Sequence, residues 1–301
     1  MRIGYPCINL TLPCRSSRTF RLSSWSEQRF LETVENNLSC LIRILEFNAS
    51  HGLLFFRITS DLVPFASHPI CRVRWQQSFE KEFRNIGDFI KRNNLRVSMH
   101  PDQFTLINSP DEKVFQRSQR ELLYHCDVMD LLGLDQTHRI QIHVGGAYGD
   151  KNASMDRFVE RYKGIPLEIR KRLAIENDDR LYCLEDCLKV HERTGIPIVF
   201  DIFHHRMNNR GESLKQSMAG FTSTWSTKDG LPIVDYSGQE QYKKPGTHAR
   251  SLDVNGFANF VEETKAFNFD IMLEIRDKEK SALRALEVLQ ARRGNTLDQE
   301  S

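Results

Sequence analysis

The chain has 301 residues, of which 40% are hydrophobic and 27% charged, and this ordinary globular composition excludes global disorder. Its net charge of +2 is too small to require a nucleic-acid partner, although a nearly neutral protein can still carry a locally basic face. No apolar run approaches the roughly 20 residues of a transmembrane helix, so we expect no membrane partner.

Short β-rich runs alternate with longer amphipathic stretches along the whole chain. We expect strands at residues 2–6, 54–59, 95–100, 139–144, 172–177, 197–204, 231–237 and 270–276. The spacing of apolar residues predicts helices at 27–51, 79–93, 112–132, 155–163, 184–194, 254–267 and 279–292, with a weaker helical pattern at 209–220. Several strand runs, such as 196–200, are almost continuously apolar, as expected of parallel strands that are buried on both faces.

This alternation predicts an α/β protein that folds as a single (β/α)8 TIM barrel. The barrel domain would span residues 1–291, and the polar, aperiodic residues 292–301 would form a frayed C-terminal tail. An open, doubly wound sheet is the alternative fold, because topology is harder to infer from a sequence than the elements themselves.

The seven cysteines form no CxxC pair, and their number is odd. They are Cys7, Cys14, Cys40, Cys71, Cys126, Cys183 and Cys187. Because residues 1–10 do not resemble a secretory signal peptide, we expect free thiols in a reducing compartment. Cys183 and Cys187 are four residues apart on an expected helix, where buried cysteines usually pack as small hydrophobic side chains rather than bind a metal.

Active sites of (β/α)8 barrels lie at the carboxyl ends of the strands, so the residue that ends each strand is informative. The third to the eighth expected strands all place His, Asp or Glu there: His100, His143, Glu176, Asp201 with His204, Asp235 and Glu274. Any one of these alone is more often a core histidine or a helix N-cap. Together, at one end of a barrel, they would be costly to bury without a compensating charge, which a divalent cation supplies.

Mixed imidazole and carboxylate donors without a thiolate favour Mn²⁺, Zn²⁺ or Fe²⁺ over Ca²⁺ or Mg²⁺. The candidate ligands outnumber those that a single ion can take from the protein while it keeps one position open for substrate or water. We therefore expect two or three ions, with a carboxylate such as Glu176 as a bridge. Paired ions of this kind suit the hydrolysis of a phosphodiester. His68 and His248 follow the second and seventh strands and can reach the same ions, although ordinary loop histidines explain them equally well.

Several motifs, in their order along the chain, resemble the UV damage endonuclease family. They are GYPC from Gly4, NLTL from Asn9, PFASHP from Pro64, SMHPDQF from Ser98, HVGGAYG from His143, IEND from Ile175 and DIFHH from Asp201. The resemblance implies a TIM-barrel DNA-repair nuclease, related to endonuclease IV, that nicks the strand immediately 5′ of cyclobutane pyrimidine dimers and (6-4) photoproducts. It also implies products with a 3′-hydroxyl and a 5′-phosphate, and a cluster of up to three metals, commonly manganese.

The same resemblance implies roles for individual residues. The expected metal ligands are His68, His100, His143, Glu176, Asp201, His204, His248 and Glu274, and catalysis is expected to depend on Glu176, Glu274, His143 and Asp201. The expected contacts to the lesion are Tyr5, Asn9, Gln103 and Phe104. Lys243 and Lys244, after the seventh strand, are expected to hold phosphates.

Two positions depart from the family. Some members carry a Lys that is carboxylated and a His at the end of the seventh strand, where this chain has Ile233 and Asp235. The modified lysine is therefore absent, and we expect Asp235 to take the role of the histidine ligand. Where the family has Gln-Tyr, this chain has Gln103-Phe104, which keeps the stacking face of a wedge but loses the hydroxyl. Tyr5 would stack from the other side.

Two other enzyme classes remain open, namely an abasic-site endonuclease of the endonuclease IV type and a metal-dependent sugar isomerase on the same barrel. A damage-binding protein with a structural metal is a third alternative, although structural sites are normally closed by four ligands. For the preferred function we expect a monomer that acts on damaged double-stranded DNA and needs no obligatory protein partner. It would lie in the cytoplasm, at the nucleoid, of a prokaryote or in the nucleus of a eukaryote.

Overall fold

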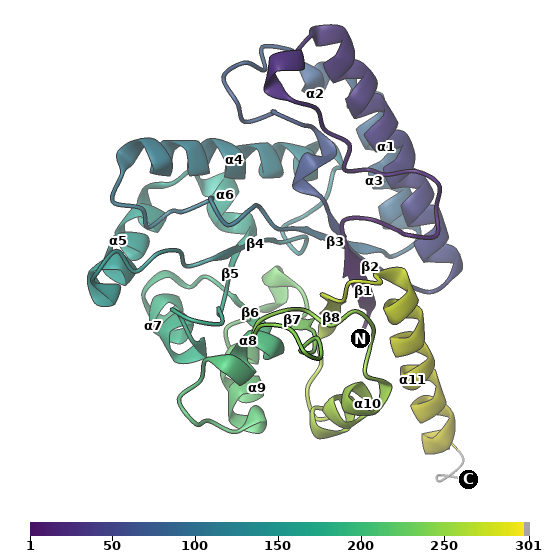
Figure 1. Ribbon diagram of the computed structural model, residues 1–301, viewed down its shortest axis with the longest axis vertical. Helices are drawn as coiled ribbons and strands as arrows, with labels where there is room; N and C mark the ends of the chain where they lie inside the picture. The colour runs from purple at the N-terminus through teal and green to yellow at the C-terminus, as the bar shows by residue number, and fades with distance from the viewer. Residues whose placement is uncertain (298–301) are drawn as a thin grey trace.

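A closed barrel of parallel strands forms the centre of the molecule, with helices packed around its outside (Figure 1). The computed structural model describes residues 1–297. The strands are β1 (Ile3–Pro6), β2 (Phe55–Ile58), β3 (Arg96–Met99), β4 (Ile140–His143), β5 (Leu173–Glu176), β6 (Ile198–Asp201), β7 (Ile233–Tyr236) and β8 (Asp270–Leu273). Each strand pairs with the next along the chain, and β8 pairs with β1. The predicted (β/α)8 barrel is confirmed, and the open sheet is wrong.

The helices follow the strands as the alternation predicted. They are α1 (Glu27–Ser50), α2 (Trp75–Ser78), α3 (Glu80–Arg92), α4 (Glu112–Leu131), α5 (Lys151–Gly164), α6 (Leu167–Arg172), α7 (Leu184–Thr194), α8 (Ile202–Met207), α9 (Leu214–Thr222), α10 (Val254–Glu263) and α11 (Glu279–Leu297). The weaker helical pattern at 209–220 is confirmed by α9. Within residues 1–297, no helix is both long and apolar enough to cross a membrane.

Local chemistry sets where these helices begin and end. The hydroxyl of Ser26 accepts a hydrogen bond from the backbone N–H of Arg29, which satisfies a free donor in the first turn of α1. At its C-terminus, α7 ends at Gly195, which has a φ of 70°. This left-handed conformation favours glycine. Caps of this kind fix the residue at which a helix ends, and therefore the residue at which the loop to the next strand begins.

An apolar layer fills the middle of the barrel. Its side chains come from five strands and are Phe55, Ala174, Val199, Ile233 and Met272. Ionic groups lie below it, at the amino ends of the strands, where Arg96 pairs with Asp270 at 3.0 Å. The apolar layer fills the barrel at mid-height, and paired charges occupy its amino end. The carboxyl ends of the strands are therefore left to form an open site.

Many element boundaries differ from those predicted by a few residues, and two of the differences affect the site and the C-terminal end. Strand β6 ends at Asp201 rather than at residue 204, because the Asp201 carboxylate accepts the N–H of His204 and begins α8. His204 therefore lies on a helix, one turn above the strand end. The last helix, α11, extends to Leu297, beyond the expected end at residue 292, and the remainder of the predicted tail, 298–301, lies outside the described residues.

The prediction that all seven cysteines are free thiols is wrong for two of them. Cys14 and Cys40 form a disulfide, with their Cα atoms 5.8 Å apart. Cys14 lies in the loop after β1 and Cys40 lies on α1, and folding brings them together although they are 26 residues apart in sequence. Cys7, Cys71, Cys126, Cys183 and Cys187 are free; Cys183 and Cys187 are buried as expected, and Cys126 is buried as well.

Candidate metal centre

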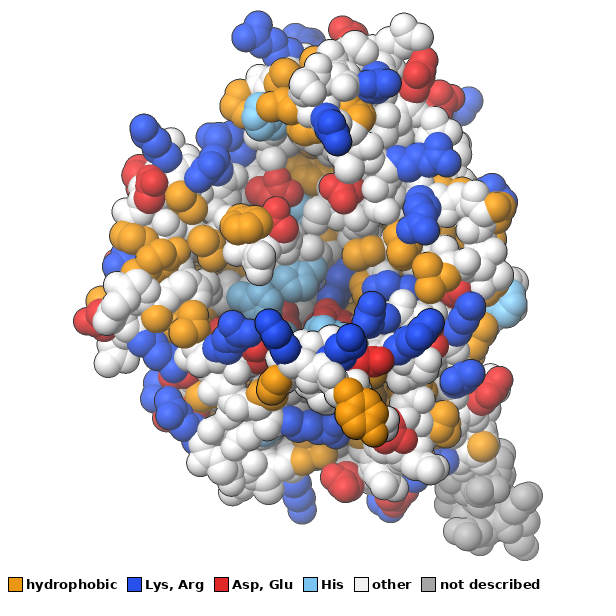
Figure 2. Space-filling view, viewed as in Figure 1, with side chains coloured by type: hydrophobic (Ala, Val, Ile, Leu, Met, Phe, Trp, Pro, Cys, Tyr) orange, Lys and Arg blue, Asp and Glu red, His pale blue; other side chains and the backbone are white. Residues whose placement is uncertain are grey.

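The carboxyl ends of the strands open into a cleft of about 820 Å³. Figure 2 shows this hollow near the middle of the visible face, with histidines on its floor and Lys and Arg side chains along its rim. His100, His143, His248 and Glu274 line the cleft, so the structure brings together residues from the third, fourth, seventh and eighth strand ends. The sequence had placed all four at a common site.

Strand register explains how the floor is assembled. His143 on β4 is the neighbour of Glu176 on β5, and Asp201 on β6 is the neighbour of Asp235 on β7. Residues that are side by side on parallel strands project in the same direction. The alternation of side chains therefore turns these four inward at one level, above the apolar layer.

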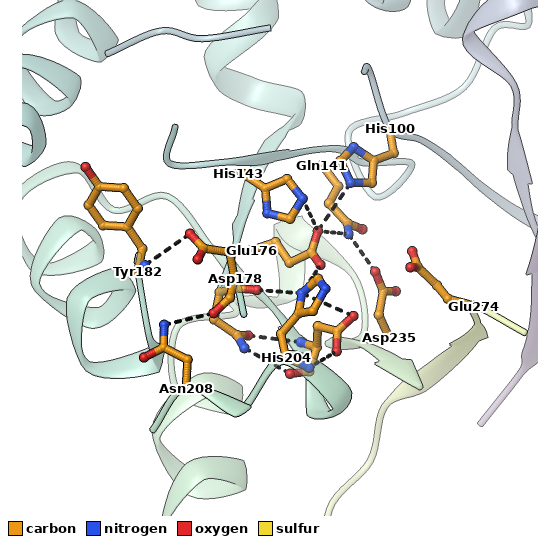
Figure 3. A network of polar contacts seen from close by, with 12 residues as sticks. His100, Gln141, His143, Glu176, Asp178, Tyr182, His204, Asn208, Asp235 and Glu274 are labelled. Atoms are coloured by element: carbon orange, nitrogen blue, oxygen red, sulfur yellow. Dashed lines mark hydrogen bonds and ion pairs between the residues drawn. The ribbon is translucent and has the colours of Figure 1, made fainter. Parts of the chain in front are cut away.

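Glu176 is the centre of the floor. Its carboxylate lies 3.3 Å from Nε2 of His100, 3.8 Å from Nε2 of His143 and 3.2 Å from Nδ1 of His204 (Figure 3). Burial raises the pKa of the Glu176 carboxyl, but these imidazoles, His143 first, reverse this and hold it well below its usual range. Glu176 is therefore a buried anion that β3, β4 and α8 surround with imidazole nitrogens.

Asp201 carries the signature of an incomplete site. One of its oxygens caps α8, while the other, Oδ2, is buried without a hydrogen-bond partner and lies 3.5 Å from Nδ1 of His204. Burial raises the pKa of the Asp201 carboxyl well above its usual range, and the neighbouring carboxylate of Glu176 adds to this. Nδ1 of His100 and Nδ1 of His143 are also buried without partners. Unsatisfied polar atoms of this kind call for a ligand or ion.

The donor set fits a pair of divalent ions. In the described part of the chain, ligating atoms within 4.8 Å of one another form two groups, His100–His143–Glu176 and Glu176–Asp201–His204. Glu176 belongs to both groups, which is the geometry of a bridging carboxylate. Imidazole nitrogens with carboxylate oxygens and no thiolate suit Mn²⁺, Zn²⁺ or Fe²⁺.

His248 and Glu274 lie beside these groups. Nδ1 of His248 is 2.8 Å from the carbonyl oxygen of Glu274, which leaves Nε2 free and 3.9 Å from the Glu274 carboxylate. A ring held by a backbone carbonyl in this way presents its other nitrogen to a metal. His68 is instead in a neighbouring pocket with Ser67, Asp102 and Phe104, and Ile70 N–H donates to its Nδ1. The structure therefore does not bring His68 into either group.

Asp235 does not lie free to replace the missing histidine. Nη2 of Arg57 donates to both of its oxygens at 2.8 Å, and Nε2 of Gln141 donates to Oδ2 at 2.6 Å. Burial raises the pKa of Asp235 to about 7, and the Arg57 guanidinium opposes that rise. The carboxylate is thus engaged by protein groups, and Asp235 belongs to neither of the two groups of metal-ligating atoms.

Arg57 and Gln141 were not predicted from the sequence. Both point into the barrel at the level of the metal groups, Arg57 from β2 and Gln141 from β4. The available signal was a polar residue inside an apolar strand, in Phe-Phe-Arg-Ile and Ile-Gln-Ile. Such a residue cannot be buried without partners, so it indicates a polar network in the interior.

The rim carries the candidate DNA contacts. Gln103 and Phe104 line the cleft, and the Phe104 side chain is 69% exposed, which is unusual for so large an apolar group. Lys243 and Lys244 are exposed on a hairpin loop that a bridge between Gln239 and His248 closes. Gly246, Thr247 and His248 of this loop line the cleft, so the two lysines lie on one of the loops that border it.

Tyr5 and Asn9, which were predicted to contact the lesion, are buried and do not line the cleft. Tyr5 is 0% exposed, and its hydroxyl donates to Asn48 on α1 and accepts from Asn9. The strand alternates, so Tyr5 faces α1 while Pro6 lines the cleft. Asn9 is also buried. Its side-chain oxygen, Oδ1, accepts hydrogen bonds from the backbone N–H groups of Thr11 and Leu12 and so fixes the loop.

Fold and site together define a (β/α)8 barrel with a candidate divalent-metal centre at the carboxyl ends of its strands. The model of the family UV-endonuclease UvdE matches residues 1–297, and the chain belongs to this family. It is 40% identical over 291 residues to the UV DNA damage endonuclease of Clostridium perfringens, and the aligned region covers 96% of this chain and 71% of that protein. The match to the UV DNA damage endonuclease of Bacillus cereus strain 03BB102 is 34% over 304 residues and covers 98% and 96%.

Solved structures agree with this assignment. The crystal structure of SacUVDE is 45% identical, with a TM-score of 0.93 over 97% of this chain and 98% of that one. Endonuclease IV from Thermus thermophilus, at 14% identity and a TM-score of 0.61 over 97% and 98%, shares the fold. The family resemblance inferred from the motifs is therefore confirmed.

Proposed function

We propose that this protein is a metal-dependent DNA-repair endonuclease that nicks the damaged strand immediately 5′ of UV photoproducts. Its substrates would be cyclobutane pyrimidine dimers and (6-4) photoproducts in double-stranded DNA, and its products a 3′-hydroxyl and a 5′-phosphate. The observation that carries the proposal is the Glu176 carboxylate, surrounded by three imidazoles on the floor of an open cleft. Membership of the UvdE family, whose relatives are called UV DNA damage endonucleases, supports the class of lesion.

Divalent ions, with Mn²⁺ as the first choice, would be held by the two groups that share Glu176. Bound there, they would polarise the phosphoryl group, lower the pKa of a water nucleophile and stabilise the leaving oxygen. Glu274 and His248 would complete the set from the neighbouring side, because both present a free donor to the same cleft. Catalysis would thus depend on His143, Glu176, Asp201 and Glu274.

The residues of the rim would select the substrate. A phosphodiester can reach the floor only if the duplex bends or extrudes nucleotides, because the histidines lie inside the cleft rather than on a flat surface. Phe104 would stack in the gap left by the displaced bases, with Gln103 beside it. Damaged base pairs stack weakly, which lowers the cost of that distortion and favours damaged over intact DNA.

A duplex with one thymine dimer tests the proposal directly. With Mn²⁺ we expect one nick, immediately 5′ of the dimer, no cut in the matching undamaged duplex, and no activity after chelation. Failure to cut with any of several divalent metals would reject the nuclease assignment. Equal cutting of a duplex with an abasic site would favour the endonuclease IV class, and turnover of ketose sugars would favour the isomerase.

The variant Glu274→Gln separates chemistry from binding. The amide keeps the shape of the side chain but removes the charge that faces Nε2 of His248. We expect nicking to fall by roughly 10³-fold while binding to damaged DNA is retained, as for loss of one preorganised electrostatic group. Glu46→Gln, on the exposed face of α1, is the matched control. Full turnover by Glu274→Gln would remove Glu274 from the catalytic set.

A further inference from the structure

A buried guanidinium lies directly beside the candidate metal groups. Arg57 lies near the carboxyl end of β2, with a side chain that is only 3% exposed. Its Nη2 donates to both oxygens of Asp235 and, at 2.9 Å, to the side-chain oxygen of Gln141, while Nη1 donates to Oε1 of Glu274. One cation from β2 therefore engages carboxylates from β7 and β8 at once.

Gln141 joins this network to the metal groups. Its Nε2 donates to Oδ2 of Asp235 at 2.6 Å and to Oε2 of Glu176 at 2.5 Å (Figure 3). Glu176, Asp235 and Glu274 are thus connected in series across the barrel, with Gln141 and Arg57 as the links. The carboxylate shared by both metal groups is held by the same network that holds Asp235.

The network treats its carboxylates differently. Asp235 has both oxygens bonded to protein donors, so an ion at Asp235 would compete with Arg57 for them. Glu274 has one oxygen on Arg57, and its other oxygen faces His248. Arg57 thereby withdraws Asp235 from ligation and aims Glu274 at the cleft with one free oxygen.

Within β7 itself, Asp235 is the one inward-facing donor, and His248, from the loop after β7, presents its Nε2 beside Glu274. Ile233, two residues before Asp235 and on the same face of the strand, belongs to the apolar layer and is buried against Phe55 and Met272. The buried carboxylate of Asp235, next to the partly exposed one of Glu274, needs a positive charge. A guanidinium, which stays protonated at every accessible pH, supplies that charge permanently.

We propose that Arg57 is a positioning residue that takes the place of a metal ion on the β7–β8 side, so that the centre holds two divalent ions rather than three. The two ions occupy the groups that share Glu176, and Glu274 reaches them with the oxygen that Arg57 leaves free. The inference rests on the proposed metal-dependent function and specifies how many ions that function uses and why.

The first test counts ions in the unaltered protein. The purified chain is stripped with a chelator, reloaded with Mn²⁺, freed of unbound metal and analysed for metal and protein content. Two ions per chain are expected. Three ions would overturn the role of Arg57 and leave the nuclease proposal intact, whereas a chain that binds none would remove the proposed metal chemistry and this inference together.

The second test removes the guanidinium. Arg57→Ala leaves Asp235 and Glu274 without their cation and opens a space between them, so the count should rise to three. Arg57→Lys keeps the charge, so the count should stay at two, while nicking falls about tenfold because an ammonium cannot hold two carboxylates in a fixed geometry. A count of two in folded Arg57→Ala would overturn the proposal.

A matched control comes from the opposite end of the barrel. Arg96 is also a buried barrel arginine, paired with Asp270, but it lies at the amino ends of the strands. Arg96→Ala should lower stability and leave the count at two. Free guanidinium ion at millimolar concentration should return Arg57→Ala to two ions and raise its nicking at least tenfold. Absence of this rescue, in a variant that folds, would mean that Arg57 acts only as a structural ion pair.

Discussion

The two ends of the barrel both bury ionic side chains, yet only one of them is a candidate site. At the amino ends of the strands, Arg96 donates to the carbonyl oxygens of Leu231 and Thr137 and to the carboxylate of Asp270. Asp270 in turn accepts from the backbone N–H and the guanidinium of Arg2. Each charge there meets an opposite charge or a backbone dipole supplied by the protein.

At the carboxyl ends the charges do not balance in this way. Glu176, Asp201, Asp235 and Glu274 face one another with the guanidinium of Arg57 and a set of imidazoles, and Oδ2 of Asp201 has no hydrogen-bond partner. Burial of charged side chains therefore does not by itself distinguish a functional site. The distinguishing feature is that buried carboxylates lack enough positive groups and hydrogen-bond donors from the protein, and a bound cation can supply what is missing.

The largest expected effect comes from removing the central charge at the carboxyl end. Glu176→Gln should reduce nicking by roughly 10³-fold or more, because both metal groups lose their shared ligand. The same variant should remain folded when metal is absent, with a loss of stability because the imidazoles no longer face a carboxylate. Thermal unfolding after chelation, together with metal content and nicking rate, checks both halves.

Asp270→Asn supplies the opposite result at the amino end. Breaking its pairs with Arg2 and Arg96 should cost about 3 kcal/mol of stability, as for other buried ion pairs that lose one partner. Metal content and nicking by the folded fraction should be unchanged. If Asp270→Asn altered the metal count, or Glu176→Gln unfolded the protein, the contrast between the two ends would fail.

The second effect is a pH dependence of stability that comes from a histidine at the amino end. His138 is buried there, with Nδ1 accepting the N–H of Val97 at 3.0 Å, and burial lowers its pKa to about 4. Its unfolded pKa is about 6.5, so between these values the unfolded chain binds the proton more readily. The stabilising contribution is therefore complete above about pH 6.5 and is lost as the pH falls towards 4, by roughly 3 kcal/mol in total.

Urea unfolding at several pH values measures this loss. His138→Asn, whose side-chain oxygen can still accept from Val97, should flatten the dependence, and the exposed His51→Asn should not. The His138 effect should persist in the presence of a chelator, because no metal is involved at this end. An unchanged acid dependence in His138→Asn would assign it to other buried groups, such as His125.

The sequence predicted one end of the barrel well for a physical reason. Strand ends in a parallel barrel all lie on one face, so listing the final residue of each strand was enough to assemble His100, His143, Glu176, Asp201 and Glu274. The ligand chemistry then followed from residue type. No contact needed to be known in advance.

The rest required contacts that spacing does not contain. The packing of Tyr5 against α1 could not be predicted, because alternation shows which residues share a face, but not which face points inward. Asp235 looked like a ligand until its partners Arg57 and Gln141 were known. Likewise, the Cys14–Cys40 disulfide depends on how the loop after β1 returns to α1.

A third, smaller effect concerns the rim of the carboxyl end rather than its floor. Phe104→Ala should reduce discrimination between dimer-containing and intact duplex by about tenfold, the order expected for one stacking aromatic. Overall affinity should fall less, because phosphate contacts remain. Competition binding with both duplexes measures the ratio. Leu10→Ala, another exposed apolar side chain, is the control. Equal losses for both duplexes would place the wedge elsewhere.

The smallest effect tests whether positive charge matters only at this end. Lys243→Ala with Lys244→Ala should weaken binding to damaged and intact DNA alike, by a few-fold at moderate salt, and reduce the slope of log affinity against log salt by up to about two. Lys91→Ala with Lys163→Ala removes the same charge from the last turns of α3 and α5, at the amino end of the barrel. That control should leave the slope unchanged. Equal slopes for the two double variants would mean that DNA senses the net charge of the protein and not its carboxyl face.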